Sequence, residues 1–264
     1  MLAGVYKAQK KDGDIYFRAN ITFRNKHISL GSFSSETKAH EAYLAASDML
    51  SIAKCSIMEA FDAYKILSFE KIICLLNFRD NGVYIKNPIY LFKTYFEYYL
   101  THSAILKFDI DDLFYYSSHK ILKRGGHLYV NDYGMQYNIL SRYGIKNYGI
   151  SGKDYIFINK DNLDFRYGNI DIINNFHGVS RLARKNKIIY QTQIHLIGYY
   201  TIGTYPDERT AAIAYNKAVD AAKDAGISKN FPTNFIDSLS AFQYAEIYSS
   251  IHLSKKYSAY LKTF

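Results

Sequence analysis

The sequence predicts an α+β protein in which two small modules, each a three-stranded antiparallel sheet with one helix, flank a mixed helical and β middle domain. Apolar and polar residues alternate along 190–196 and again along 199–202, and a period of two is typical of half-buried antiparallel strands. The period becomes helical after residue 203, because Ala211, Ala214 and Ala218 fall on one helical face. The same succession of patterns occurs near the start of the chain, from residue 4 to residue 50.

Residues 4–50 and 178–222 align as two copies of one unit. From Gly31 in the first copy and Gly203 in the second they run without a gap, and the differences in length fall in turns, where insertions are best tolerated. Such an internal repeat predicts two copies of one supersecondary unit. The paired positions are Gly4 and Val5 with Gly178 and Val179, Phe17 with Tyr190, Ile21 with Ile194, and Glu36, Ala39, Ala42, Tyr43, Ala46 and Asp48 with Glu208, Ala211, Ala214, Tyr215, Ala218 and Asp220.

The net charge of +9 lies mainly in the two copies. Residues 1–54 hold 8 basic and 5 acidic side chains and residues 176–230 hold 8 and 4, whereas residues 55–175 hold 14 and 13. A basic surplus confined to two modules predicts that they face a polyanion. A modestly basic surface that is simply solvated is the alternative interpretation.

Composition excludes several classes of protein. A hydrophobic content of 48% argues against disorder, and no apolar run approaches the roughly 18 residues of a membrane helix. Because the first copy begins almost at Met1, we expect no secretion signal, and the two cysteines suit a reducing cytoplasm. Phosphate-binding loops, nucleophile elbows and paired Cys-x-x-Cys motifs are missing from the sequence, so no cofactor is expected.

The first module is expected to span residues 1–54. Its helix should be capped by Ser34, with Glu36 in the favoured first turn, and should run to about Ile52. Alternation places one set of strand residues against this helix: Val5, Phe17, Ala19, Ile21, Phe23, Ile28 and Leu30. The other set forms an open polar face: Tyr6, Ala8, Arg18, Asn20, Thr22, His27 and Ser29.

A helical connector is expected over residues 55–105. Residues 56–79 keep a helical period that ends at Asp80-Asn81-Gly82, and residues 84–100 predict an edge strand followed by a helix. In the middle domain, residues 106–175, Asp109 should cap a short helix, and a Gly125-Gly126 turn should lead into a strand over 127–130. His119 and His127 fit no standard zinc motif, so no metal site is expected.

The second module is expected over residues 176–232, with a turn at Ile197-Gly198. A C-terminal region, residues 233–264, should hold a helix over 239–254 and then a polar tail.

Both modules open with Gly-Val, close with Leu/Ile-Gly-x-Phe/Tyr and carry an Ala-Tyr-x-x-Ala helix. In these features each copy resembles the Apetala/ethylene-response-factor DNA-binding domain of plants, which also occurs in bacterial and phage proteins. The resemblance implies a sheet that enters the major groove of double-stranded DNA, with its open face on bases and phosphates. This chain lacks the Arg- and Trp-rich pattern of the plant domains, which favours an AT-leaning site, since Asn and Gln pair with adenine and Arg with guanine.

Position by position, the resemblance implies three groups of DNA-contacting residues. Those of the first open face are Tyr6, Ala8, Asn20, Thr22, His27 and Ser29. Those of the second are Ser180, Leu182, Gln191, Gln193, His195, Tyr199 and Thr201. The adjacent cations suited to phosphate are Lys7, Arg18, Arg24, Arg181, Arg184 and Lys185. The alternative interpretation is that these polar residues merely solvate the exposed side of a sheet.

Residues 106–175 resemble an HNH endonuclease module, most clearly in YIFINKDNLDFRYGNIDII from Tyr155 to Ile173. The matching positions are Asn159, Asp161, Leu163, Asp164, Arg166 and Asn169. Ile156 and Phe157 stand where the family carries its metal-binding Asp and catalytic His, and Phe165 replaces the central Asn. Metal-assisted hydrolysis needs both a metal ligand and a base, so we expect a nuclease that has lost catalysis, with Arg166 and Asn169 as additional DNA contacts.

The expected function is therefore a sequence-specific double-stranded-DNA-binding protein, a repressor or activator of bacterial or phage genes that acts in the cytoplasm at the nucleoid. It needs neither cofactor nor membrane, and a homo-oligomer is left open. One alternative is an active or accessory homing-type endonuclease with a displaced metal site. Another is a protein whose sheets bind other proteins.

Overall fold

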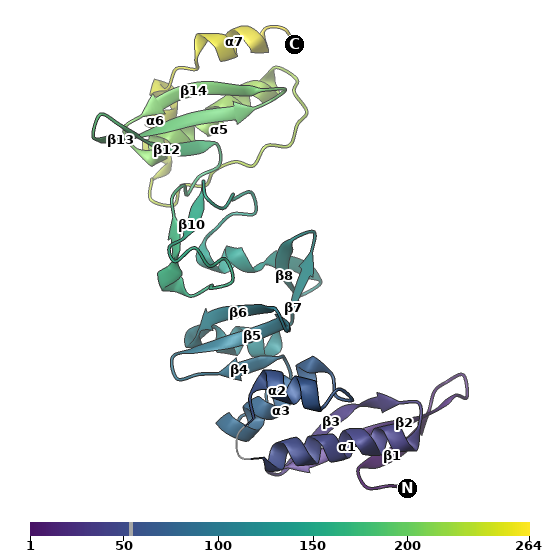
Figure 1. Cartoon of the computed structure of the whole chain (residues 1–264). Coiled ribbons are helices and arrows are strands. Elements are labelled where there is room, and N and C mark those ends of the chain that lie inside the picture. Colours follow the sequence, from purple (N-terminus) through teal and green to yellow (C-terminus); the bar gives the residue numbers. More distant parts are fainter. Residues whose placement is uncertain (53–54) are drawn as a thin grey trace. The chain divides into compact units, whose positions relative to one another are not determined.

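The computed structural model describes residues 1–52 and 55–264 and has the predicted α+β fold (Figure 1). The chain forms two compact units, of which the first comprises residues 1–139 with 161–169 and the second comprises residues 140–160 with 170–264. The expected domain boundary at residues 54 and 55 falls on a segment, 53–54, that lies outside the described residues. Among the described helices, none is long and apolar enough to cross a membrane.

The first module is a sheet of order β1-β2-β3 covered on one face by a helix, as predicted (Figure 1). Its elements are β1 (Val5–Gln9), β2 (Ile15–Phe23), β3 (Lys26–Phe33) and α1 (Glu36–Ser51). The predicted helix-facing residues form its core, and Ala39, Ala42 and Ala46 are fully buried against them. The cap is Ser35 rather than Ser34, because the Ser35 hydroxyl accepts a hydrogen bond from the Lys38 N–H at 3.3 Å.

The second module repeats this arrangement with β12 (Val179–Arg184), β13 (Lys187–His195), β14 (Tyr199–Tyr205) and α5 (Glu208–Asp224). The match extends to an irregularity in strand pairing: the register shifts between Ala19 and Asn20 in β2 and between Thr192 and Gln193 in β13. Bulges of this kind bend a strand at a defined place. The repeat predicted from the sequence is therefore confirmed down to the register.

The glycine that opens each module lies under the tyrosine of its helix. Gly4 and Gly178 both have φ +73°, and an added Cβ would meet the ring of Tyr43 or Tyr215 respectively. A left-handed backbone in close contact with a ring accepts only glycine without strain. This explains why both copies have a glycine at this position and a tyrosine at the matching position of the helix.

The C-terminal residues are not a polar tail. After α6 (Ala241–Ser250), a second helix, α7 (Lys255–Leu261), packs on the second module. Tyr257 is fully buried, and its hydroxyl donates to the Ala218 carbonyl of α5 at 2.6 Å. One buried aromatic side chain thus fixes a segment whose composition is mostly polar.

The connector holds two helices, α2 (Ile57–Ala63) and α3 (Phe69–Asn81), where one continuous helix was expected. The Ser68 hydroxyl caps α3 by accepting from the Lys71 N–H, and the buried Leu67 lies in the break. The end of α3 at Gly82, which adopts the left-handed conformation, is as predicted.

A sheet follows, with β4 (Ile89–Leu91), β5 (Tyr95–Thr101) and β6 (Ala104–Asp109) in antiparallel order. The helix expected within residues 84–100 is wrong. Phe96 and Tyr98 alternate inward along β5, and aromatic side chains suit a strand that packs on a core.

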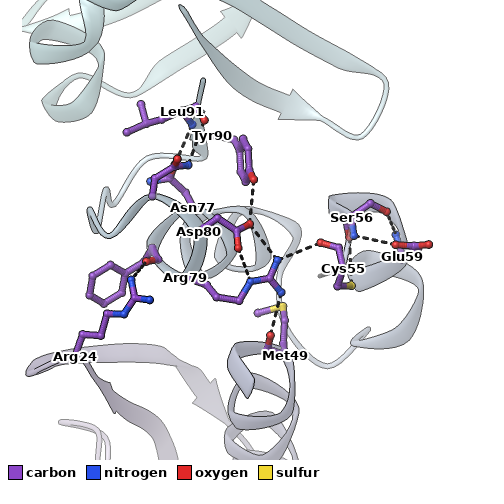
Figure 2. A network of polar contacts seen from close by, with 12 residues as sticks. Arg24, Met49, Cys55, Ser56, Glu59, Asn77, Arg79, Asp80, Tyr90 and Leu91 are labelled. Atoms are coloured by element: carbon purple, nitrogen blue, oxygen red, sulfur yellow. Dashed lines mark hydrogen bonds and ion pairs between the residues drawn. The ribbon is translucent and has the colours of Figure 1, made fainter. Parts of the chain in front are cut away.

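Arg79 of α3 joins four parts of the first unit (Figure 2). Its guanidinium donates to the Met49 carbonyl at the end of α1 and to the Cys55 carbonyl before α2, both at 3.2 Å. It also donates to both carboxylate oxygens of Asp80, at 2.6 and 3.0 Å. The Tyr90 hydroxyl of β4 donates to the same carboxylate at 2.9 Å. A charge that is 9% exposed is thereby fully paired.

The remaining elements of the middle region are short. They are η1 (Ile110–Asp112), α4 (Leu113–Ser118), β7 (Ile121–Arg124), β8 (His127–Asp132), β9 (Met135–Asn138), η2 (Ile139–Tyr143), β10 (Tyr155–Phe157), η3 (Tyr167–Asn169) and β11 (Ile170–Ile172). The Gly125-Gly126 turn and the strand after it are as predicted. Asp109 does precede η1, but its carboxylate makes no cap and accepts from the Tyr167 N–H at 2.7 Å.

Residues 106–175 are divided between the two compact units. Residues 161–169 join the first unit, where the Lys107 N–H donates to the Leu163 carbonyl and the Phe165 N–H donates to the Lys107 carbonyl. β10 pairs with β11 in the second unit. The segment that resembles a nuclease motif therefore contributes to both units.

Candidate nucleic-acid interface

The open face of the first sheet presents three cross-strand pairs of side chains. Tyr6 pairs with Arg18, Asn20 with Ser29, and Thr22 with His27. All six are exposed or partly exposed, and Tyr6 is 51% exposed. The opposite face of the same strands is buried against α1. The separation into a core face and an open face is the one that period two predicts.

Contacts between neighbours hold several of these side chains in place. The Arg18 guanidinium donates to the Tyr16 hydroxyl at 2.6 Å and lies 5.4 Å from the centre of that ring. Thr22 Oγ1 and His27 Nδ1 are 3.2 Å apart, and the His27 ring meets the Tyr6 ring edge-on. Ordered side chains lose less entropy on binding than free ones. Arg18 is the cation on this face best placed to bind an anion.

The open face of the second sheet has the same construction. Ser180 pairs with Gln191, Gln193 with Thr201, and His195 with Tyr199, at the positions that correspond to the three pairs of the first sheet. In both sheets one of the three pairs joins the first and second strands, and the other two join the second and third strands. The Gln193 amide donates to Thr201 Oγ1 at 3.2 Å, and the rings of His195 and Tyr199 are 4.6 Å apart. Ala8 and Leu182, the remaining expected positions, lie in the same rows.

The expected phosphate-binding cations have different surroundings. Lys7, Arg184 and Lys185 are exposed, and Lys185 lies in the tight turn between β12 and β13. Arg181 and Lys7 are exposed but share the strand sides of Val179 and Val5, which face the helices, so both border the open faces instead of lying on them. Each of these four side chains can meet a phosphate without crossing the core.

Arg24 has an intramolecular role that the sequence did not predict. Its guanidinium donates to the Phe78 carbonyl in the last turn of α3 at 3.2 Å, and it lies over the Phe23 ring. Cations near a helix C-terminus interact favourably with the carbonyl groups there. Arg24 thus joins the first module to α3, and because the residue is exposed its expected contact with phosphate stays a prediction.

Lys229 was missed by sequence reasoning. Its ammonium donates to the His195 carbonyl at 2.8 Å and lies 3.4 Å from His195 Nδ1, so it adds a positive charge beside the second open face. It lies over the Phe231 ring, which is buried in the module core. Lys229 lies just before Phe231 and Pro232 at the end of the module, where no periodic pattern could predict the direction of its side chain.

A pocket of about 170 Å³ adjoins the second open face. Its lining includes Tyr148 and His177 together with Ser180, Gln193 and Tyr199 of the sheet. The ring of His177 contacts the rings of Tyr148 and Tyr215 edge-on, at 4.2 and 5.0 Å. Burial lowers the pKa of His177 below its ordinary value of 6.5, with the Asp154 carboxylate opposing the shift. This imidazole is therefore held neutral near pH 7.

The residues that depart from the nuclease pattern lie in strands and core. Ile156 and Phe157 belong to β10, where they pair with Asp171 and Ile170 of β11. Phe165 is 4% exposed and stacks on Phe108 of β6, with ring centres 5.5 Å apart. An apolar side chain in such surroundings offers no ligand or base.

The two additional DNA contacts expected here are not equally accessible. Asn169 is 6% exposed, and its amide donates to the Asp164 carbonyl at 2.7 Å. A buried amide bound in this way ties the loop together, so the expected contact of Asn169 with DNA is corrected to a structural role. Arg166 forms two hydrogen bonds to the buried Asp164 carboxylate, at 2.9 and 2.7 Å, but keeps 42% of its side chain exposed.

The described part of the chain contains no group of three or more His, Cys, Asp or Glu residues that could hold a metal ion. His119 stacks on Tyr115 at 4.2 Å, and its Nε2 lies 3.5 Å from the Asp132 carboxylate. Comparison of the chain with protein-family models, with curated proteins and with solved structures finds no match. The resemblances described from the sequence therefore remain predictions.

Proposed function

We propose that this protein is a non-enzymatic, sequence-specific double-stranded-DNA-binding protein that regulates transcription, as repressor or activator, of bacterial or phage genes at the nucleoid. The observation that supports this most is the correspondence of the two open faces. Each presents three cross-strand pairs of hydrogen-bonding side chains at matched positions, beside a register shift at the same place.

The chemistry of these faces suits the edges of bases. The major groove of B-form DNA admits a β-ribbon, and each base pair displays a distinct pattern of donors and acceptors there. Amide side chains such as Asn20 and Gln193 both donate and accept, which matches adenine. Arg18, Lys7, Arg184 and Lys185 supply charge for the phosphates that flank the groove.

The two faces are not identical, so the proposed site has two different halves. Arg18 of the first sheet corresponds to the uncharged Gln191 of the second, and Thr22 corresponds to His195. When two DNA-binding modules lie on one chain, binding of the first module raises the local concentration of DNA at the second. The overall affinity then increases without any new contact. We therefore propose a bipartite, AT-leaning target rather than a perfect palindrome.

Absence of catalysis is part of the proposal. Ile156, Phe157 and Phe165 replace the residues that the HNH resemblance assigns to metal and proton transfer, and Phe165 is committed to an apolar stack. Incubation of the purified protein with plasmid DNA and magnesium or manganese should leave the plasmid supercoiled. Nicking that is lost in Asn169→Ala would contradict this part of the proposal.

The experiment that tests DNA reading is selection of bound duplexes from a random library at moderate salt. Enrichment of a bipartite motif with fixed spacing is expected, because both sheets should read bases at once. Enrichment of one short motif would mean that only one of the two sheets recognises a base sequence. Binding that weakens as salt rises, with no enriched motif, would mean that the sheets contact DNA independently of its sequence. The proposal that the protein regulates transcription would then be wrong.

A further inference from the structure

A third small sheet in the first unit has the same two-faced construction as the two modules. In the sheet β7-β8-β9, Ile121 and Val130 are 2% and 1% exposed and face the core. The Ile121 N–H donates to the buried Tyr98 hydroxyl of β5 at 3.0 Å, which anchors β7 to that core. The opposite face of the sheet is consequently directed away from the core.

Register places four polar residues on this outward face. Arg124 pairs with His127 across β7 and β8, and Asn131 pairs with Gln136 across β8 and β9. All four are exposed. They are the residue types that the open faces of the modules carry, Arg18 and Asn20 in one and Gln193 and His195 in the other.

The end of β7, beside the turn to β8, carries the positive charge of this sheet. Arg124 is exposed on this outward face at the end of β7. The neighbouring Lys123 is also exposed but pairs with Leu128 on the other face, which carries the one acidic residue between positions 121 and 138, Asp132. Asp132 is also paired with His119 at 3.5 Å. The outward face thus complements a polyanion.

The turn between β7 and β8 leaves room for a phosphate to approach its backbone closely. Gly125 and Gly126 have φ +56° and +85°, as a two-residue hairpin turn of this hand requires, and nothing lies within 4 Å of a Cβ built on either. Backbone amides flanked by Lys123 and Arg124, without side chains above them, suit a phosphate.

From the shared face chemistry and the basic turn, we propose that the outward face of β7-β8-β9 is a third DNA-contacting surface, which binds the phosphate backbone of double-stranded DNA. This inference rests on the proposed function and extends it to the middle region. Arg124 on this face and Lys123 beside the adjoining turn contact phosphates, while Asn131 and Gln136 form hydrogen bonds to the DNA backbone. The surface adds affinity but little sequence preference.

The test uses the full-length protein, a labelled mixed-sequence duplex and a series of salt concentrations. Arg124→Gln should make the plot of log affinity against log salt less steep by about one, and Lys123→Gln combined with Arg124→Gln by about two, since each lost phosphate contact removes about one released ion. The matched control is Lys38→Gln. Lys38 is exposed on α1, the helix that covers the face of the first sheet opposite its open face. Circular dichroism confirms that each variant is folded.

The outcomes separate this inference from the proposed function. If the wild-type protein binds DNA and the double variant keeps the wild-type slope, the third surface is refuted while DNA binding stands. If the wild-type protein does not bind DNA, both fail. Tighter binding to an RNA duplex than to DNA, lost in the double variant, would also overturn the inference, because the surface would then serve RNA.

Discussion

The backbone N–H of Asn20 donates to the Gly4 carbonyl at 2.9 Å, and the backbone N–H of Gln193 donates to the Gly178 carbonyl at 2.8 Å. The two amide side chains therefore start from equivalent anchored positions in separate sheets. Each comes directly after the register shift in its sheet, which falls between Ala19 and Asn20 in the first module and between Thr192 and Gln193 in the second.

Asn20→Ala and Gln193→Ala should each relax base preference at one position of the selected site, by about 1–3 kcal/mol of discrimination. Arg18→Ala should instead weaken binding to all duplexes alike and reduce the salt dependence. Competition binding with single-base variants of the site measures both effects. Equal losses for every duplex with Asn20→Ala would show that this amide does not read bases.

Gly178→Ala should destabilise the second module by more than about 1 kcal/mol, because it combines a left-handed φ with a clash against Tyr215. Urea unfolding followed by circular dichroism measures the loss. Gly198→Ala is the matched control: nothing lies within 4 Å of its added Cβ, so its unfolding free energy should stay close to that of the wild type. A neutral Gly178→Ala would contradict the tight contact with the helix.

Arg79→Met should lower the unfolding free energy by about 2–3 kcal/mol, since the Met49 and Cys55 carbonyls and the Asp80 carboxylate would lose their shared donor. Lys93→Met, a change of an exposed cation in the same unit, serves as control and should have little effect. If both variants unfold at the same urea concentration as the wild type, the network of Figure 2 does not contribute to stability.

His177 should make the second unit less stable in mild acid. Burial holds the pKa of His177 below 6.5, so the unfolded chain binds the proton more readily than the folded one. Its contribution to stability is present above about pH 6.5 and is lost as pH falls below that value. His177→Gln should reduce the fall in unfolding free energy between pH 6.5 and 5, whereas the exposed-residue control His252→Gln should retain it. Parallel pH profiles for wild type and His177→Gln would exclude this role.

Local periodicity explains why so much of the two modules could be predicted. A side chain in a strand points to one face or the other according to its position, so the rows that contain Asn20 and Gln193 followed from alternation alone. The alanine face of each helix followed from the helical period in the same way. Because the two copies show the same patterns at aligned positions, each prediction for one module was supported by the other.

The failures involve partners far away in the sequence. Arg24 meets Phe78 across 54 positions, and Tyr257 reaches Ala218 across 39, so neither contact leaves a local pattern. Residues 84–100 were predicted to be part helix because aromatic side chains fit either structure, whereas in the folded protein they pack as strands of the buried sheet β4-β5-β6.

The sequence by itself determined the α+β class, the repeat, and which residues of each sheet face outward, because these depend on backbone periodicity over a few residues. Only the tertiary structure decided that Arg24 contacts a helix end, that Asn169 is buried, that Lys229 joins the second open face, and that residues 161–169 belong with the first unit. Each of these depends on the packing of segments distant in sequence, where the burial of apolar surface and the pairing of buried polar groups override local preference.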